Sequence, residues 1–227
     1  MSEHIVTAFT DDLEQISAEL MRMGGLVESM MADACVAIKS ADTDLAKTVI
    51  ARDDEVDALQ ADIERQIVRV LALRQPMARD LRDVISALKI AGDLERVGDL
   101  SENIARRAKR LGGEEAPKLM KGLLRMGRAV ATQLRAVLDA YTAGDAEAAI
   151  QVCRGDDDID QHYISVFREM LTYMMEDPRL IGTGTTLLLI AKNLERIGDH
   201  CTNIAEVVHF LVTGEYPPPM NDEEHTG

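Results

Sequence analysis

The sequence predicts an all-α protein made of two tandem pseudo-repeated three-helix bundles, each with an up-down-up order of helices. Three observations favour this fold: few aromatic residues, few prolines and an internal repeat. Aromatic residues make up 3% of the chain and Trp is absent, which suits helix packing better than sheets. Three of the six prolines are consecutive near the end, Pro217 to Pro219, so long uninterrupted helices are permitted.

The repeat is visible when the sequence is compared with itself. With a shift of 103 positions, Met23-Gly24 falls on Met126-Gly127, and the acidic stretch 53–57 (DDEVD) falls on 156–160 (DDDID). Farther along, the shift becomes 100, and 88–105 (LKIAGDLERVGDLSENIA) matches 188–205 (LLIAKNLERIGDHCTNIA). The second copy has therefore lost three residues between the two matched blocks, and the chain is a tandem duplication.

Each copy is expected to hold three helices. The first copy should have helices from about Thr10, as N-cap, to Ser40, from Asp42 to Leu73 and from Met77 to Leu111, and the second over 118–143, 145–176 and 180–213. The predicted breaks are Arg74-Gln75-Pro76, Gly112-Gly113, Gly144 and Asp177-Pro178. The first repeat then covers 1–113 and the second covers 114–214, and 215–227 form a flexible, proline-rich tail.

Apolar residues recur with helical spacing. In the third helix of the first copy they form a stripe of Ile90, Leu94, Val97 and Ile104, which returns in the second copy as Ile190, Leu194, Ile197 and Ile204. The three cysteines, Cys35, Cys153 and Cys201, form no CxxC motif, and their odd number is typical of buried free thiols in a reducing compartment. Cys201 lies on the stripe and is expected to be a small core residue.

The chain carries a formal net charge of −15, which repels nucleic acid and anionic lipid and attracts cations. A basic stretch at 106–110 is expected to complement the dipole at a helix C-terminus, with docking of an acidic partner as the alternative. The start shows no signal peptide, and no apolar run is long enough to span a bilayer, so a soluble, cytoplasmic protein is expected. No Gly-rich nucleotide-binding loop follows a strand.

Acidic residues four positions apart share one face of a helix. Four such pairs occur at matching places in the two copies: Asp53/Asp57, Glu95/Asp99, Asp156/Asp160 and Glu195/Asp199. Asp57 and Glu95 each lie 19 residues from Pro76, so antiparallel helices joined there place both at one level, about 28 Å from the turn. In the second copy, Asp160 lies 18 residues before Pro178 and Glu195 lies 17 after it. Each bundle is therefore predicted to gather four carboxylates from two adjacent helices.

Four neighbouring carboxylates repel one another, and three interpretations account for them. A hard cation with oxygen ligands, such as iron(III), manganese, magnesium or calcium, would neutralise them, and zinc is disfavoured because Cys and His are absent from the shared pattern. Arginine pairing by Arg96 and Arg196 is the second interpretation, and contact with a protein partner is the third. Asn103 and Asn203 would orient the carboxylates or complete an ion site. Gly98 and Gly198, inside helices, indicate close approach of a neighbouring helix or a ligand.

The two Leu-Glu-Arg-(Val/Ile)-Gly-Asp motifs, the stretch 74–82 (RQPMARDLR) and the duplication resemble the PhoU family, over about His4 to Tyr216. The resemblance implies a cytoplasmic, non-catalytic regulator of phosphate uptake that represses the phosphate-starvation response. It implies the phosphate ABC transporter ATPase and a phosphate-responsive sensor histidine kinase as partners, and a homodimer. It also implies iron or zinc clusters at the eight acidic positions named above, with manganese or magnesium as further candidate ions.

The alternative is a helical-bundle metalloprotein with enzymatic or metal-storage activity. Carboxylate-bridged di-metal enzymes use two Glu-x-x-His motifs that face inward. The chain has one, Glu206 to His209, and the first copy has Arg106 and Lys109 at those positions. His200 could add a ligand next to Asp199, but its counterpart is Leu100, and we interpret it as a bystander.

Overall fold

The computed structural model describes residues 2–111 and 117–218, and side-chain positions for 9–111 and 120–218. The helices are α1 (Ser2–Ser40), α2 (Thr43–Arg74), α3 (Arg79–Leu111), α4 (Pro117–Ala143), α5 (Ala146–Arg154), α6 (Asp156–Glu176) and α7 (Ile181–Thr213), with a 3-10 turn, η1 (Pro178–Leu180), before α7. No strand occurs in these ranges. The all-α prediction is confirmed.

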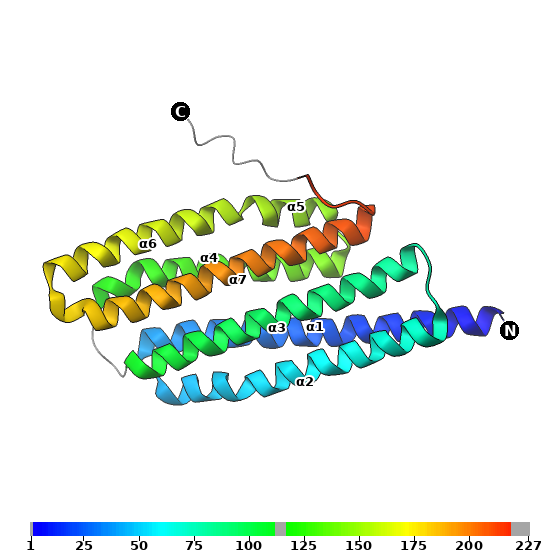
Figure 1. Cartoon of the computed structure of the whole chain (residues 1–227), viewed down its shortest axis with the longest axis horizontal. Coiled ribbons are helices and arrows are strands. Elements are labelled where there is room, and N and C mark those ends of the chain that lie inside the picture. Colours follow the sequence, from blue (N-terminus) through cyan, green and yellow to red (C-terminus); the bar gives the residue numbers. More distant parts are fainter. Residues whose placement is uncertain (1, 112–116, 219–227) are drawn as a thin grey trace.

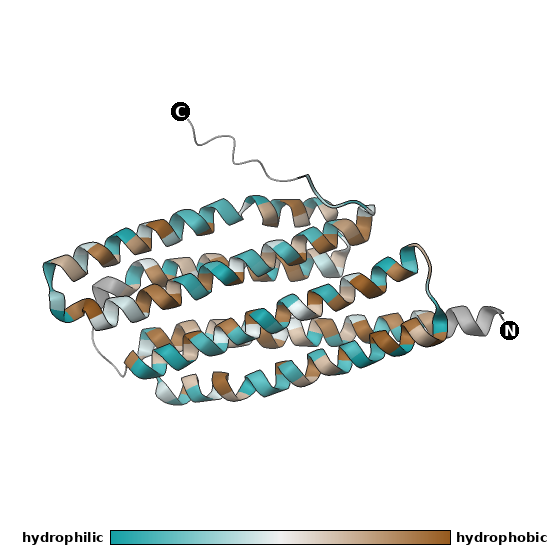
Figure 2. Ribbon diagram, in the orientation of Figure 1, coloured by the Kyte–Doolittle hydropathy of each residue, from teal (hydrophilic) through white to brown (hydrophobic). Residues whose placement is uncertain are grey.

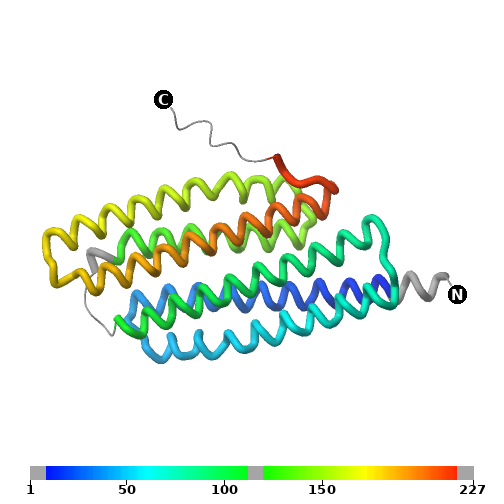
Figure 3. Tube along the Cα trace, in the orientation of Figure 1, coloured from blue at the N-terminus to red at the C-terminus, as the bar shows by residue number. Residues whose placement is uncertain are grey.

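The helices form two bundles that lie side by side with parallel long axes (Figure 1). The first bundle holds α1, α2 and α3, and the second holds α4, the α5–α6 pair and α7. The α2–α3 turn and the α6–α7 turn lie at opposite ends of the molecule (Figure 3). Apolar and polar residues are interleaved along every helix, and none is apolar throughout (Figure 2). The predicted stripes are buried, with Ile104, Leu194 and Cys201 fully inaccessible to water.

Equivalent residues end and begin the helices of the two copies. Asp42 caps α2 by accepting hydrogen bonds from the backbone N–H groups of Asp44 and Leu45, and Asp145 caps α5 by accepting from that of Ala148. Before these caps, Ala41 and Gly144 adopt positive φ of 53° and 61°, the left-handed conformation that ends a helix. The duplication therefore preserved the turn chemistry.

Two sequence-based helix boundaries differ substantially from the structure. Thr10 is not an N-cap, because α1 already begins at Ser2. The helix predicted over 145–176 is divided at Gly155, whose helix propensity is low, and the three aspartates that follow it favour a new helix N-terminus. The predicted boundary between repeats, 113/114, falls outside the described residues.

The expected flexible tail begins with an ordered contact. Tyr216 stacks on Phe210 with ring centroids 4.6 Å apart, and its hydroxyl accepts a hydrogen bond of 2.7 Å from Lys89 of α3. Residues 219–227 lie outside the described part of the chain.

The two bundles meet along α3 and α7 and along α1 and α4. A Cβ added at Gly24 of α1 would lie 2.7 Å from Leu138 Cδ2, and one added at Gly127 of α4 would lie 2.9 Å from Cys35 Sγ. Gly24 and Gly127 are equivalent in the repeat, and so are Cys35 and Leu138. The α1–α4 contact is therefore pseudo-symmetric and depends on glycine at both crossings.

We predict that Gly24→Val lowers the free energy of unfolding by about 1–3 kcal/mol, because the added atoms overlap Leu138. The matched control is Gly25→Val, since an added Cβ at Gly25 meets nothing within 4 Å and Val has the better helix propensity. Guanidinium denaturation followed by circular dichroism measures both. Equal stabilities would contradict this packing.

Candidate functional site

The first carboxylate cluster lies where α2 and α3 meet. It consists of Asp53, Asp57, Glu95, Asp99 and Glu102. Asp53 Oδ1 lies 3.4 Å from the point that a Cβ on Gly98 would occupy, so the two helices approach closely here. Asp57 is exposed, and the other four side chains are half-buried. The charges of these residues act on one another, so the acidic side chains of the two helices lie near one another in the first copy.

The second carboxylate cluster joins α6 and α7 in the same way. It consists of Asp156, Asp160, Glu195 and Asp199. Asp156 Oδ1 lies 3.2 Å from the Cβ position of Gly198, as Asp53 does near Gly98. Asp156 and Glu195 are half-buried, while Asp160 and Asp199 are exposed. The loss of three residues from the second hairpin therefore left this arrangement intact.

Burial and mutual repulsion raise the pKa values of carboxyl groups in the first cluster. Partial burial raises the pKa of Asp53 from 3.8 to about 7, and the charges of Glu102, Asp99, Asp57 and Glu95 add to the effect. Burial also raises the pKa of Glu95, and Asp99 raises it further, although Arg96 opposes this.

The second cluster shows the same physics. Although both side chains are largely exposed, partial desolvation raises the pKa of Asp160, and the charges of Asp156 and Glu195 raise it further. Partial desolvation also raises the pKa of Asp199, to which Glu195 and Asp156 add, while Lys192 lowers it. Both clusters thus hold more negative charge than their surroundings neutralise, and they favour a proton or a cation.

The two clusters differ in the basic residues that form ion pairs with them. Arg96 bridges the first cluster, with Nε 3.4 Å from Glu95 and Nη1 3.2 Å from Asp99. Its counterpart Arg196 is exposed and makes no hydrogen bond or ion pair with residues that the structure describes. In the second cluster Lys192 instead pairs with Glu195 at 2.5 Å. The expected arginine pairing therefore occurs in the first copy alone.

Asn103 and Asn203 also differ in their hydrogen-bond partners. Asn103 donates a hydrogen bond of 2.9 Å to the backbone carbonyl of Asp99, which fits a supporting place beside the first cluster. Asn203 is exposed and its amide lies 3.4 Å from Asp93 of α3, so it faces the other bundle.

Two residues of these sites were missed by the sequence analysis. Glu102 makes the largest contribution of any neighbouring charge to the pKa of Asp53, and it forms an ion pair with Arg106. Its spacing of seven residues from Glu95, two helical turns, was an available signal. Gln133 of α4 is 7% exposed and donates a hydrogen bond of 3.2 Å to Asp156. No periodic pattern indicated it, because its counterpart in the first copy is Met30.

The donor set of both clusters suits a hard cation, because carboxylate oxygens are the ligands that magnesium, manganese and calcium prefer. In the second cluster, Glu195 Oε2 and Gln133 Oε1 are buried and lack a hydrogen-bond partner, which is the condition a cation would relieve. Among the residues described, no three Asp, Glu, His or Cys side chains are arranged as ligands of one ion. The metal assignment of the eight acidic residues stays a prediction.

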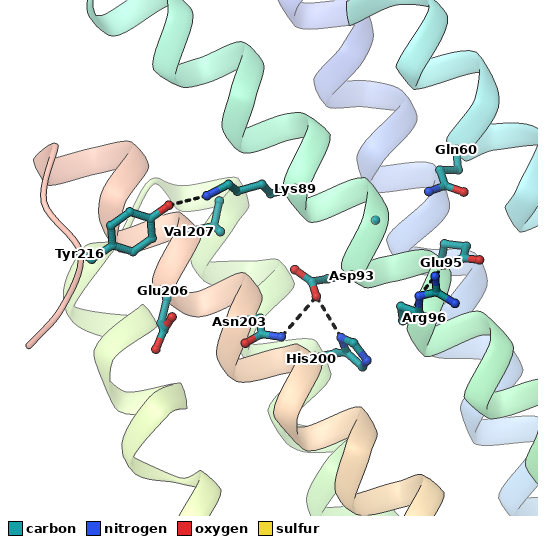
Figure 4. A pocket seen from close by; sticks show the side chains of 11 residues that line it. Gln60, Lys89, Asp93, Glu95, Arg96, His200, Asn203, Glu206, Val207 and Tyr216 are labelled. Atoms are coloured by element: carbon teal, nitrogen blue, oxygen red, sulfur yellow. Dashed lines mark hydrogen bonds and ion pairs between the residues drawn. The ribbon is translucent and has the colours of Figure 1, made fainter. Parts of the chain in front are cut away.

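A groove of about 510 Å³ runs between α3 and α7, on the seam of the two bundles, and it borders the first cluster, because Glu95 and Arg96 line it (Figure 4). In it, His200 Nδ1 lies 2.9 Å from Asp93 Oδ1, an ion pair that links the bundles when the imidazole is protonated. His200 thus faces Asp93 rather than joining the second cluster. Glu206 lines the same groove, while His209 Nδ1 contacts the backbone carbonyl of Glu215 at 2.8 Å. The single Glu-x-x-His motif therefore does not build a di-metal centre.

The cysteines are free, as predicted. Burial raises the pKa of the Cys35 and Cys153 thiols to about 11, and it raises that of Cys201 still more. None of the three is poised as a nucleophile. The basic stretch ends α3, with Lys109 and Arg110 in the last turn, which fits the helix-dipole interpretation.

Comparison with known proteins assigns the family. The PhoU domain model matches twice, over residues 20–108 and 123–208, one match for each bundle. The chain belongs to the PhoU family. It is 50% identical over 216 residues to the phosphate-specific transport system accessory protein PhoU homolog of Caulobacter vibrioides, covering 95% of this chain and 94% of that protein. It is 39% identical over 215 residues to the accessory protein PhoU of Escherichia coli, covering 95% and 89%.

The fold agrees with solved PhoU structures. The crystal structure of PhoU from Pseudomonas aeruginosa superposes with a TM-score of 0.89 at 41% identity, covering 91% of this chain and all of that one. PhoU from Streptococcus pneumoniae, described as a phosphate transport system regulatory protein, gives a TM-score of 0.85 at 32% identity, covering 92% of this chain and 99% of that one.

We predict that Asp53→Asn stabilises the protein in the absence of added cations. The folded state holds the Asp53 proton up to a pKa of about 7, whereas the unfolded chain releases it near 3.8, so the wild-type stability falls as pH rises between these values. Removing the charge should raise the free energy of unfolding by roughly 1–2 kcal/mol at about pH 8 and change it little at about pH 4.

Urea denaturation of chelator-treated protein at the two pH values measures this difference. Asp54→Asn, an exposed neighbour on the same helix, is the control and should show a smaller dependence on pH. If Asp53→Asn raises the free energy of unfolding equally at both pH values, the Asp53 carboxylate is not repelled by the other carboxylates of the cluster.

Proposed function

We propose that this protein regulates phosphate transport by binding to the transport machinery and that it represses phosphate uptake and the phosphate-starvation response when phosphate is plentiful. The observation that carries the proposal is the double PhoU match, which covers both bundles, together with one acidic cluster on each. The relatives are named as accessory or regulatory proteins of a phosphate transport system rather than as enzymes.

The proposed partners are the ATPase of the phosphate ABC transporter and the phosphate-responsive sensor histidine kinase. Both present surfaces in the cytoplasm, which is the compartment we propose for this chain, with a homodimer as its assembly state. The part of the chain that the structure describes contains no helix with an apolar stretch that could span a bilayer. Regulation then requires that the protein bind its partners with different affinities in the two phosphate states, because an effector shifts an equilibrium only by its differential affinity.

Within this function we propose that the carboxylate clusters hold cations. The residues that would bind them are Asp53, Asp57, Glu95 and Asp99 in one cluster and Asp156, Asp160, Glu195 and Asp199 in the other. Iron, zinc, manganese and magnesium are the candidate ions, and a bound ion would supply positive charge that offsets the repulsion among the carboxylates. The support is chemical: oxygen ligands and raised carboxyl pKa values at both clusters, and buried oxygens without partners at the second.

We predict that removing one carboxylate from each cluster impairs the regulatory function. In a bacterium that lacks its own copy of this protein, the wild-type chain should keep a phosphate-starvation reporter silent in phosphate-rich medium. The double variant Asp99→Asn/Asp199→Asn should leave the reporter at least several-fold more active, because each cluster loses a charge that an ion or a partner would contact.

Pull-down of the transporter ATPase and the sensor kinase with the same variants identifies the step that is lost. Asp54→Asn/Asp157→Asn serves as the matched control, since both residues are exposed and stand next to the clusters. A double variant that silences the reporter as well as the wild type does would remove the clusters from the proposed mechanism. A wild-type chain that neither silences the reporter nor retains either partner would overturn the proposed function.

A further inference from the structure

The two carboxylate clusters are related by duplication, but their surroundings differ in which oxygens are free. In the first cluster, Gly98 faces methyl groups of Val56 and Val27, at 3.1 Å and 3.6 Å from its Cβ position, together with one carboxylate oxygen of Asp53. In the second cluster, Gly198 faces a methyl group of Ile159 at 3.3 Å, the equivalent of Val56, but also two oxygens, Gln133 Oε1 and Asp156 Oδ1, each at 3.2 Å. The second cluster therefore has an additional oxygen donor.

The orientation of Gln133 is fixed by its hydrogen bonds. Its amide nitrogen donates to Asp156 Oδ1 at 3.2 Å and to the backbone carbonyl of Val152 at 3.4 Å. Because both partners are acceptors, the nitrogen must point at them and the carbonyl oxygen must point the other way. That oxygen lies over Gly198 and lacks a hydrogen-bond partner, although the side chain is only 7% exposed. A buried carbonyl oxygen in this state is costly unless something binds it.

Glu195 supplies a second free oxygen. Its Oε1 pairs with Lys192 at 2.5 Å, while its Oε2 is buried without a partner. Glu195 precedes Gly198 by three residues on α7, so it stands on the face of the helix that Gln133 Oε1 and Asp156 Oδ1 cover. The second cluster thus has two buried oxygens without a partner, one on Gln133 of α4 and one on Glu195, which is itself one of the four carboxylates.

In the first cluster, by comparison, basic side chains already pair with the carboxylates. Arg96 bridges Glu95 and Asp99, and Arg106 pairs with Glu102, so a cation entering it must displace guanidinium groups. The position of Gln133 is taken by Met30, a fully buried thioether that offers no hard oxygen. The position of Arg96 in the second cluster is held by Arg196, which is exposed and makes no ion pair with the described chain.

We propose that the clusters are inequivalent cation sites, that the second fills first, and that Gln133 contributes its carbonyl oxygen to a hard divalent cation there. This inference rests on the proposed role of the clusters as cation sites and assigns to them an order and an additional ligand. Binding at the first cluster follows at higher cation concentration, because the Arg96 pairs compete with it.

Titration of the chelator-treated, full-length protein with Mn²⁺, with the free ion counted by electron paramagnetic resonance, tests the order of filling. Glu195→Gln should abolish the tighter class of sites, and Glu95→Gln should leave it intact. Gln133→Met, which installs the residue of the first copy, should weaken the tighter class by about ten-fold without affecting the weaker one. Arg96→Ala should strengthen the weaker class.

Gln151→Met is the matched control, because Gln151 is an exposed glutamine on the neighbouring helix α5, and the variant should bind Mn²⁺ as the wild type does. Circular dichroism verifies that Gln133→Met folds. The inference is overturned if Glu95→Gln removes the tighter class, if the two classes have equal affinity, or if Gln133→Met binds as the wild type does. If neither cluster binds Mn²⁺, both the inference and the proposal that the clusters hold cations are overturned. If both clusters bind Mn²⁺ equally, the inference is overturned but the proposal that the clusters hold cations is not.

Discussion

The structure depends on apolar packing that forces like charges together. Val97 and Val56 are fully buried where α3 meets α2, and the same helix contact holds Asp53 against Gly98. Core burial of this kind is worth kilocalories per side chain, more than the repulsion among half-exposed carboxylates. The carboxylates therefore stay in place, and the repulsion appears instead as raised pKa values.

Because the chain is duplicated, apolar packing holds acidic side chains close together in both bundles. Gly24 and Gly127 let α1 and α4 approach closely at equivalent points, so the second bundle repeats the environment of the first. The groove between α3 and α7 breaks the symmetry, since His200 and Asp93 meet where the other copy has Leu100 and Asn193. A regulator with two related sites can thus respond differently at each.

The clusters lie at the surface rather than in a bundle core, and this distinguishes them from centres that activate a substrate. Enzymes of the di-metal type direct their ligands inward to a dry cavity. Here several of the acidic side chains are exposed, so a bound ion would remain accessible to solvent or to a partner surface. Such a location suits control of affinity, which is what a transport accessory protein of this family requires.

The sequence by itself determined the duplication, the all-α class and the four acidic pairs, because helical periodicity and repeat offsets are local properties. Counting residues from Pro76 and Pro178 also predicted that the acidic residues of adjacent helices share a level. The sequence could not predict the break at Gly155, because a single glycine is often tolerated within a long helix. The predicted start of α1 was wrong because Thr10, a residue type that often caps helices, lies inside a helix that begins at Ser2.

Only the tertiary structure decided how the two clusters differ. Gln133 reaches the second cluster from α4 through packing between helices, and Glu102 joins the first cluster at a position where the second copy has Thr202, so neither belongs to a motif that the two copies share. The pairing of Arg96, and its absence at Arg196, is likewise a matter of side-chain geometry on otherwise identical Leu-Glu-Arg motifs. Periodicity places a residue on a face of a helix, but the neighbours that bind or leave free its polar atoms come from distant parts of the chain.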